Sequence, residues 1–438
     1  MWKKLLCIIT AAAVQLSFGA LDWNITGSGA RAAGMGNAFI GLADDATAIN
    51  WNPGGLTALE HFEASVVGGA VLDKEVYTFS DNNGWNYEDE ITYSHANLSF
   101  LSMAYPMKVG EKKLVLAASF QKQLDFFSED SWENDTENYE YNSEGGVYTA
   151  NIGAAYQVLP YLSIGTTANL WTGSSNSDEV YVDNDYSYEY TSYDEFSSFK
   201  GFNVTIGTIF DYSAIKENIP LKIGAVVKTP FNLKADYYFE ENNTYDEYWD
   251  YNSEVTIEMP FMFGIGASYR FGDFFTLSVD FEKRNYAKSK VIEESERDGS
   301  YEYYLSDNEK DVAQFRMGME YLVVTDNLVI PLRAGIFNYP TLWSNIDTDY
   351  EYNSSSGEYE PVLYTYEQLT GYGFSLGSGV IFESFALDIS YNFVTYTNES
   401  NETYSGGLFD GYTTETAWEN SKSALNLSAI LYLDSFTK

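Results

Sequence analysis

Beyond its first twenty residues the chain has no cysteine and no long apolar run. Its single cysteine, Cys7, lies in a stretch with Lys3 and Lys4 ahead of an apolar run that ends in small residues. That order predicts a secretory signal over residues 1–20. The mature chain then has no thiol, which excludes a disulfide framework and thiolate chemistry. A run of 18 apolar residues, the least that a membrane helix needs, is also absent.

Basic residues and histidines are scarce. The chain has 24 Lys and Arg against 64 Asp and Glu, a formal charge of −40. Nucleic acids as partners are therefore excluded, because their binding needs a basic surface. The two histidines, His61 and His95, stand apart from any nucleophile motif, so we expect neither enzyme activity nor a cofactor. Acidic residues gather in connecting segments without the spacing of a calcium loop, which favours a hydrated surface over a metal site.

Tyrosine and phenylalanine are abundant and alternate with polar or small residues from residue 61 onward. There are 38 Tyr and 28 Phe in the chain. Period-two alternation puts one apolar and one polar face on opposite sides of a strand. It predicts about fourteen strands, over 61–79, 91–105, 112–127, 146–158, 161–172, 196–212, 220–235, 254–271, 274–290, 311–324, 328–339, 368–382, 385–398 and 418–433. Strands can cross a membrane only as a closed barrel, since lipid offers no partner to a free edge.

The segments between these strands alternate in length. Five short ones, 159–160, 214–220, 272–273, 326–327 and 383–384, alternate with six long ones, 129–145, 173–195, 236–253, 291–310, 340–367 and 399–417. Short turns at one end and long loops at the other are typical of a bacterial outer-membrane barrel. We therefore predict an all-β, multi-pass antiparallel transmembrane barrel over residues 61–438. A soluble all-β protein, the alternative, would not alternate so regularly.

Residues 21–60 differ from the rest, because they are rich in Gly and Ala and show no strand alternation. We expect them to fold as a hatch inside the barrel. Gly34 and Gly36 would allow close backbone packing or a positive φ. The remaining candidates here are Arg31 as an ion-pair partner, Asp44 and Asp45 as partners of Arg31 or caps of backbone amides, and Asn52 and Pro53 as the turn into the first strand.

Four basic residues fall on the inward phase of predicted strands: Lys228, Arg284, Arg316 and Arg333. A cation in an apolar lumen could hold the carboxylate of a ligand through a charge-assisted hydrogen bond. Inward acids such as Glu282 and Glu320 offer these cations a simpler role in internal ion pairs. Both interpretations stay open from the sequence.

The third predicted strand breaks its own pattern at Lys122. This lysine shares the phase of Leu116 and Phe120, which would face lipid. A charge on the lipid face is costly near the bilayer midplane and cheap at its rim. Lys122 therefore either lies at the outer rim or marks a bulge in the strand.

The N-terminal segment resembles the start of the mature FadL/TodX outer-membrane transporters. The resemblance rests on Arg31, Gly34-Met35-Gly36, Ala43-Asp44-Asp45-Ala46 and Asn52-Pro53, with Gly54 in place of the usual Ala. It implies passive uptake of hydrophobic small molecules, such as long-chain fatty acids or aromatic hydrocarbons, by a monomer surrounded by outer-membrane lipid. It also implies a lateral opening at a kink in the third strand, here around Gln121, Lys122 and Gln123.

Two other functions remain as alternatives. The same segment resembles barrels of the PorV type, through Arg31–Gly36 and Trp51–Pro53, which implies a shuttle or scaffold for protein secretion with envelope or secretion proteins as partners. A general-diffusion porin is the second alternative, which the hatch disfavours.

Overall fold

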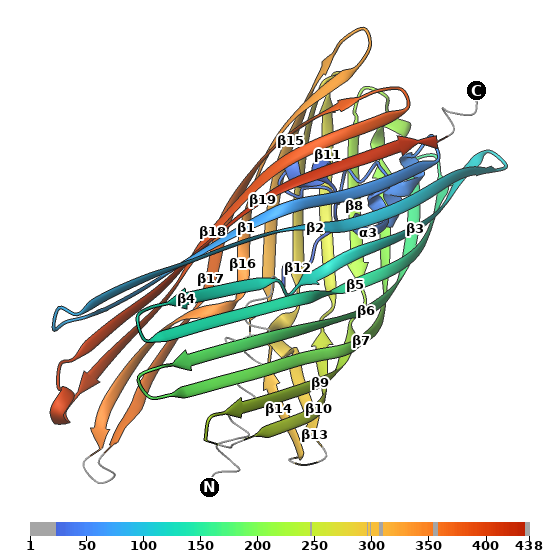
Figure 1. Cartoon of the computed structure of the whole chain (residues 1–438). Coiled ribbons are helices and arrows are strands. Elements are labelled where there is room, and N and C mark those ends of the chain that lie inside the picture. Colours follow the sequence, from blue (N-terminus) through green and yellow to red (C-terminus); the bar gives the residue numbers. More distant parts are fainter. Residues whose placement is uncertain are drawn as a thin grey trace.

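The chain forms a closed barrel of fourteen antiparallel wall strands (Figure 1). The computed structural model describes residues 23–245, 248–295, 297, 299–305, 310–353 and 358–433, with the side chains of Tyr364 and Tyr366 left aside. The predicted signal, residues 1–20, lies outside the described residues. In the described part of the chain, no helix has the length and apolar character to cross a membrane.

Nineteen strand segments build the wall, and the predicted count of fourteen is confirmed because five wall strands each consist of two segments. The segments are β1 (Glu63–Asp81), β2 (Asn86–Val109), β3 (Lys112–Asp125), β4 (Ser128–Glu133), β5 (Glu137–Leu159), β6 (Leu162–Asp183), β7 (Tyr188–Asp211), β8 (Leu221–Lys228), β9 (Phe231–Asn243), β10 (Trp249–Met259), β11 (Met262–Phe271), β12 (Phe275–Arg284), β13 (Lys290–Ser295), β14 (Gly299–Tyr304), β15 (Val312–Val324), β16 (Val329–Asn353), β17 (Glu358–Ile381), β18 (Phe385–Ser405) and β19 (Thr413–Tyr432). The interrupted strands are β3/β4, β8/β9, β10/β11, β12/β13 and β14/β15. Pairing of β1 with β19, from Glu63–Tyr432 to Asp81–Thr414, closes the barrel.

The predicted long loops are wrong, because most of their residues belong to strands. In the segment 173–195, for example, β6 runs on to Asp183 and β7 begins at Tyr188. The outward faces of these hairpin extensions carry many acidic and hydroxyl side chains, so the apolar row that marks a lipid-facing strand disappears. Their Tyr, Val and Thr residues still favour strand structure.

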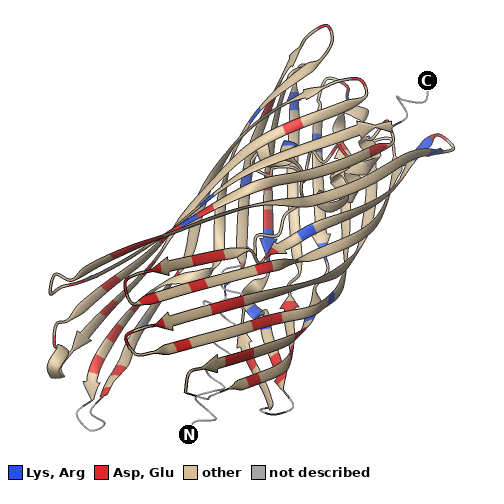
Figure 2. Cartoon of the chain, in the orientation of Figure 1, with Lys and Arg blue, Asp and Glu red and all other residues tan. Residues whose placement is uncertain are grey.

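An apolar belt surrounds the half of the barrel next to the short turns. Its outward side chains are exposed, as in the row Phe315, Met317, Met319 and Tyr321 of β15. Each strand contributes about ten residues, the length of a tilted membrane crossing. Acidic residues instead concentrate on the long hairpins beyond the belt (Figure 2).

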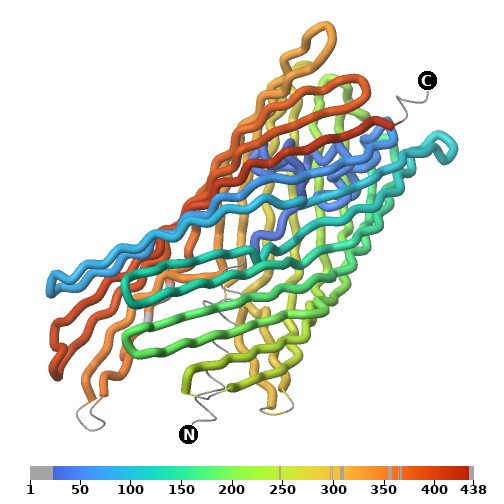
Figure 3. The backbone as a smooth tube through the Cα atoms, viewed as in Figure 1, coloured from blue at the N-terminus to red at the C-terminus, as the bar shows by residue number. Residues whose placement is uncertain are grey.

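Beyond the belt the wall divides into two sheets, which separate clearly in Figure 3. The first outer sheet consists of the distal parts of β17, β16, β18, β19, β1 and β2. The second outer sheet consists of β4, β9, β10, β13 and β14 with the distal parts of β5, β6 and β7. Among the described residues, no ladder joins β2 to β4 or β14 to β16. The outer half of the barrel therefore has two seams.

A line of backbone irregularities separates the second outer sheet from the belt. The strands break at 126–127, 229–230, 260–261 and 285–289. Between the first two breaks, β7 contains Ser198 with φ +58°. Pro230 and Pro260, which cannot donate a ladder hydrogen bond, occupy two of the breaks. Beyond this line the inner face is packed with large apolar side chains such as Phe196, Leu233 and Tyr237.

Residues 23–62, called the N-terminal segment from here on, lie inside the barrel. They contain helices α2 (Ala30–Gly34) and α3 (Ala48–Trp51) and the 3-10 helix η1 (Pro53–Ala58), drawn in blue in Figure 1. Three short 3-10 helices, η2 (Tyr212–Ala214), η3 (Tyr286–Lys288) and η4 (Gly407–Phe409), lie elsewhere. The side chains of Met35, Phe39, Ile49 and Leu56 are fully buried against the wall.

Candidate functional site

The N-terminal segment packs against a wall in which glycines leave room for its backbone. Gly36 has φ +63°, and a Cβ there would lie 3.0 Å from the amide nitrogen of Ile336. On the facing strand, a Cβ on Gly335 would lie 2.2 Å from the amide nitrogen of Gly36. Other wall glycines in such contact with the segment are Gly153, Gly165, Gly207, Gly224, Gly264, Gly266, Gly318 and Gly377. Backbone lies on backbone around much of the barrel, so larger side chains at these positions would displace the segment.

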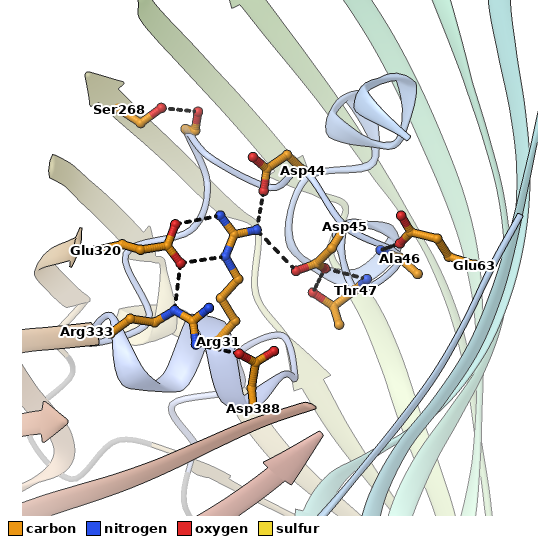
Figure 4. Close-up of polar contacts among 11 residues, drawn as sticks. Arg31, Asp44, Asp45, Ala46, Thr47, Glu63, Ser268, Glu320, Arg333 and Asp388 are labelled. Atoms are coloured by element: carbon orange, nitrogen blue, oxygen red, sulfur yellow. Dashed lines mark hydrogen bonds and ion pairs between the residues drawn. The ribbon is translucent and has the colours of Figure 1, made fainter. Parts of the chain in front are cut away.

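An ionic network ties this segment to the strands. Figure 4 shows Arg31 of α2 between two groups of carboxylates. Its Nη1 lies 2.6 Å from Asp44 Oδ1 and 3.7 Å from Asp45 Oδ2, so Arg31 forms the ion pair expected from the sequence. Its Nε and Nη2 each donate a hydrogen bond of 3.1 Å to Glu320 of β15. Arg333 donates to Glu320 as well, at 2.7 Å, and to Asp388 at 2.6 Å.

The other hatch candidates fix the backbone of the segment. Asp45 Oδ1 accepts hydrogen bonds from the amide of Thr47, at 2.9 Å, and from its hydroxyl. Asn52 donates to the carbonyl of Ile40 at 2.9 Å and to that of Thr208 on β7 at 3.0 Å. Its own Oδ1 accepts from Gly54, and Pro53 begins η1. Asn52 thus joins two parts of the segment to each other and to the wall.

Three of the four inward basic residues, Arg284, Arg316 and Arg333, form ion pairs with carboxylates inside the barrel. Arg333 has the two carboxylates named above. Arg316 lies 3.1 Å from Glu282, which also contacts Arg284. Arg284 further donates to the carbonyl of Ile25 at 2.8 Å. These arginines hold the fold of the lumen together.

Lys228 differs from them, because no hydrogen bond or ion pair joins it to another described residue. It lines a cavity of about 50 Å³. Trp171, Phe231 and Met259 provide apolar lining, while Asn203 and other residues provide amide and hydroxyl groups. A half-buried amino group beside an apolar surface is suited to an anionic head group with an apolar body.

Two larger cavities lie on either side of the N-terminal segment. One of about 350 Å³ is lined by Arg31, Glu63 and Arg270 and lies at the short-turn end. The other, of about 320 Å³, lies toward the long hairpins and is lined by residues 24–29 and residues 121–125. We call them the inner and the outer cavity. The segment therefore separates two compartments of the lumen.

The outer cavity reaches the seam between β2 and β4. Pairing of β2 with β3 ends at Phe100–Gln121. On the other side of β3, the register with β5 shifts between Lys122 and Leu124, so Gln123 is a bulged residue. The sequence left a bulge and a rim position open for Lys122, and the bulge is what the structure contains. Lys122 itself lies 3.0 Å from Asp125.

Side chains bridge this seam at its end next to the apolar belt, where the backbone pairing of β2 with β3 stops. His95 Nε2 of β2 lies 2.8 Å from Asp125 Oδ2, and Asn97 donates to the same oxygen at 3.0 Å. His95 also stacks on Phe127, with ring centroids 4.2 Å apart. A few side-chain contacts thus replace a continuous ladder between the outer cavity and the exterior.

The wall glycines and the contact between Asn50 and Gln121 were not predicted from the sequence. Asn50 of α3 donates to Gln121, which donates to the carbonyl of Thr26 at 2.9 Å. Gln121 therefore contacts the segment instead of facing the seam. A glycine on the inward phase of most strands was the available signal. In the described part of the chain, no group of three or more His, Cys, Asp or Glu side chains could hold a metal ion.

Comparison with known proteins gives one family and one fold. The model of the BamG family matches residues 24–321. A FadL homologue of Pseudomonas aeruginosa is similar in structure, with a TM-score of 0.63 and 11% identity over 93% of this chain and 98% of the other. The toluene transporter TodX of P. putida has a TM-score of 0.57 and 13% identity over 92% and 99%. The monoaromatic hydrocarbon channel CymD has a TM-score of 0.56 and 16% identity over 93% of this chain and 98% of the other. No curated protein sequence matches the chain.

Proposed function

Because the chain belongs to the BamG family and has the FadL/TodX fold, we propose that it is an outer-membrane channel for hydrophobic small molecules. Transport is passive, and long-chain fatty acids or aromatic hydrocarbons are the expected classes of substrate. The protein acts as a monomer surrounded by outer-membrane lipid, and it is not an enzyme. One observation carries the proposal: the outer cavity meets a seam where the wall ladder is interrupted.

The seam supports a lateral route. A hydrophobic molecule in the outer cavity lies beside residues 121–125, at the outer rim of the apolar belt. Moving sideways there brings it to lipid without passing the N-terminal segment and the inner cavity. Transfer of an apolar solute from water into the bilayer is favourable, so passage needs no energy source.

The N-terminal segment supports a hatch function. Its ion pairs are mostly shielded from water, and the carboxylate of Glu320 is only 5% exposed. Breaking a buried ion pair by removing one partner is expensive, so this network keeps the segment in place. In this proposal the segment blocks a continuous water channel between the outer and the inner cavity.

Lys228 supports a distinction between the two substrate classes. A fatty acid places its carboxylate beside the Lys228 amino group and its chain along Trp171 and Phe231. An aromatic hydrocarbon has no charge for Lys228 to hold, so its retention depends on the apolar lining alone. Replacement of Lys228 therefore affects the two classes differently.

The first test is native mass spectrometry with lipid extraction on protein purified from its own outer membrane. We expect a co-purifying fatty acid or hydrocarbon. A fatty acid is lost from Lys228→Gln and kept by Lys222→Gln, a matched control on the same face of β8 that lines the inner cavity. A hydrocarbon is kept by both variants.

Two outcomes would contradict the proposal. One is a protein without a hydrophobic compound that also fails to speed uptake of toluene or oleate into liposomes. The other is a barrel isolated with a bound secreted protein, which would favour the secretion shuttle.

A further inference from the structure

The strand β2 has a free edge over more than half of its length. Over Asn86–Ser99 it pairs with β1 alone, because the ladder with β3 begins at Phe100. On the other side of β4, the ladder with β5 leaves its edge toward β2 without a partner among the described residues. Backbone N–H and C=O groups along such an edge are a template for pairing with another chain.

The free edge lies outside the apolar belt. The outward residues of β2 are apolar from Leu98 to Tyr105, and beyond them come Ser94, Thr92 and Glu90. At the base of the edge, His95 and Asn97 contact Asp125, and the Tyr93 hydroxyl contacts the Ser128 side chain of β4. The part from residue 86 to residue 92 extends along the first outer sheet, where a macromolecule in water can reach it (Figure 1).

Like charges keep the two strands of the seam apart. β2 has Glu88, Asp89 and Glu90, and β4 has Glu129, Asp130 and Glu133. The pKa of Asp130 is raised by burial and by the charge of Asp89 across the seam. Of the six, Glu90 has a lysine at 2.7 Å, Lys74 on β1. Like charges on facing strands oppose pairing, so β2 and β4 do not zip together.

We propose that the free edge of β2 binds an extended, basic segment of a partner protein by strand addition. The added strand forms backbone hydrogen bonds along residues 86–92, and its Lys or Arg side chains lie over Glu88 and Glu90, which share one face of β2. Trp85 and Tyr87, 63% and 49% exposed, receive its apolar side chains.

The charge of the chain decides between this occupant and a second copy. A copy would place the same acidic strand against Glu88, Asp89 and Glu90, with the repulsion that already separates β2 from β4. A basic strand removes that repulsion on both sides. The inference does not depend on transport, since the edge lies outside the lumen and its cavities.

The test uses the full barrel in a neutral detergent and three fluorescent ten-residue peptides. The first alternates Lys and Val, the second has Glu in place of Lys, and the third is the Lys peptide with a methyl group on every second backbone nitrogen. We expect the first peptide to bind at least tenfold more tightly than the other two. Methylation keeps the charge and removes backbone donors, so it separates strand pairing from attraction between charges alone.

Two charge-reversal variants locate the binding site. Glu88→Lys with Glu90→Lys should weaken binding of the Lys peptide at least tenfold. Glu415→Lys with Glu419→Lys is the matched control, because β19 is paired on both sides, and its binding should stay within twofold of wild type. Hydrogen exchange should slow at alternate amides of residues 86–92 when the peptide binds.

Three results would overturn the inference. Equal binding of the methylated peptide would show attraction without strand pairing. Equal losses in the two variants would show attraction to the acidic surface as a whole. Exchange in residues 86–92 that does not change would place the peptide elsewhere.

Discussion

Arg31 and Glu320 are joined by two hydrogen bonds of 3.1 Å each, across 289 positions of the sequence. The guanidinium of Arg31, in the lumen, thus forms a bidentate pair with the carboxylate of Glu320, in the wall. This geometry adds specificity as well as attraction. Glu320 is shared with Arg333, and Arg31 with Asp44 and Asp45. The stability with which the N-terminal segment is held in the barrel should therefore depend on the side chain of Arg31.

Removal of that side chain should loosen the N-terminal segment. In Arg31→Ala, three carboxylates lose their common partner, and we expect a loss of about 3–5 kcal/mol in the free energy of unfolding. The ion conductance of single barrels in planar bilayers should rise. Arg270→Ala is the control, since the Arg270 side chain is exposed and bonds to the carbonyl of Asp273. Unchanged conductance and uptake in Arg31→Ala would count against a hatch.

Two glycines with nearly the same φ separate backbone strain from crowding. Gly36 has φ +63° and touches the wall, whereas Gly110 has φ +66°, and a Cβ there would have no neighbour within 4 Å. Each replacement by Ala costs about 1–2 kcal/mol of strain. Gly36→Ala should lower the stability of the barrel more than Gly110→Ala does, because the backbone of Ile336 must also move. The midpoint of thermal unfolding, measured from the mobility of heated samples on gels, compares the two. Equal shifts would mean that the wall yields to the extra methyl group.

The bulge at Gln123 offers a test of the lateral route. Deletion of Gln123 removes the extra residue and should let the ladder between β3 and β5 continue without a shift. We expect uptake of toluene into proteoliposomes to fall at least tenfold. Gln123→Ala keeps the bulge and should retain uptake within about twofold. If the deletion variant folds and transports like wild type, the ligand does not leave at this seam.

The second outer sheet should become less stable as the pH rises from about 4 to 6. Burial raises the pKa of Asp194, on the distal part of β7, to about 6. A carboxyl group whose pKa is higher in the folded state than in the unfolded state stabilises the fold in its protonated form. This contribution is complete below pH 4 and is lost as the pH passes 6.

Asp194→Asn removes this dependence. The loss for wild type amounts to at most about 3 kcal/mol, and the variant should keep the hydrogen bond that Asp194 accepts from Tyr237 at 2.5 Å. Hydrogen exchange of β7 and β9 amides at pH 5 and pH 8 measures this loss of stability in wild type and in the variant. The same pH dependence in the variant would assign the effect to another group.

Structure that depends on local pattern could be predicted from the sequence, whereas contacts between distant positions could not. Alternation identified all fourteen wall strands, because lipid on one side forces a period of two. The partner of Arg31 among nearby residues was predictable, whereas Glu320 was not, because nothing local links position 31 to position 320. The hairpin extensions were missed because their outward faces meet water instead of lipid, so these strands lack the continuous apolar row on which the prediction relied.

The glycines were the other limit. Gly207 leaves room for Asn52, and a Cβ at Gly207 would lie 2.1 Å from Asn52 Oδ1. A sequence shows that a strand glycine is small without showing what occupies the space. Only the position of the N-terminal segment inside the barrel gives these glycines a common explanation.

That position also constrains the order of events during biogenesis. The wall touches the segment from most directions, and the pairing of β1 with β19 closes the circle directly after Phe62. A finished cylinder would have to admit about forty residues through an interior that they fill. Residues 23–62 must therefore pack among the forming strands before the ladder between β1 and β19 closes the barrel. The wall strands then assemble around a segment that is already in place.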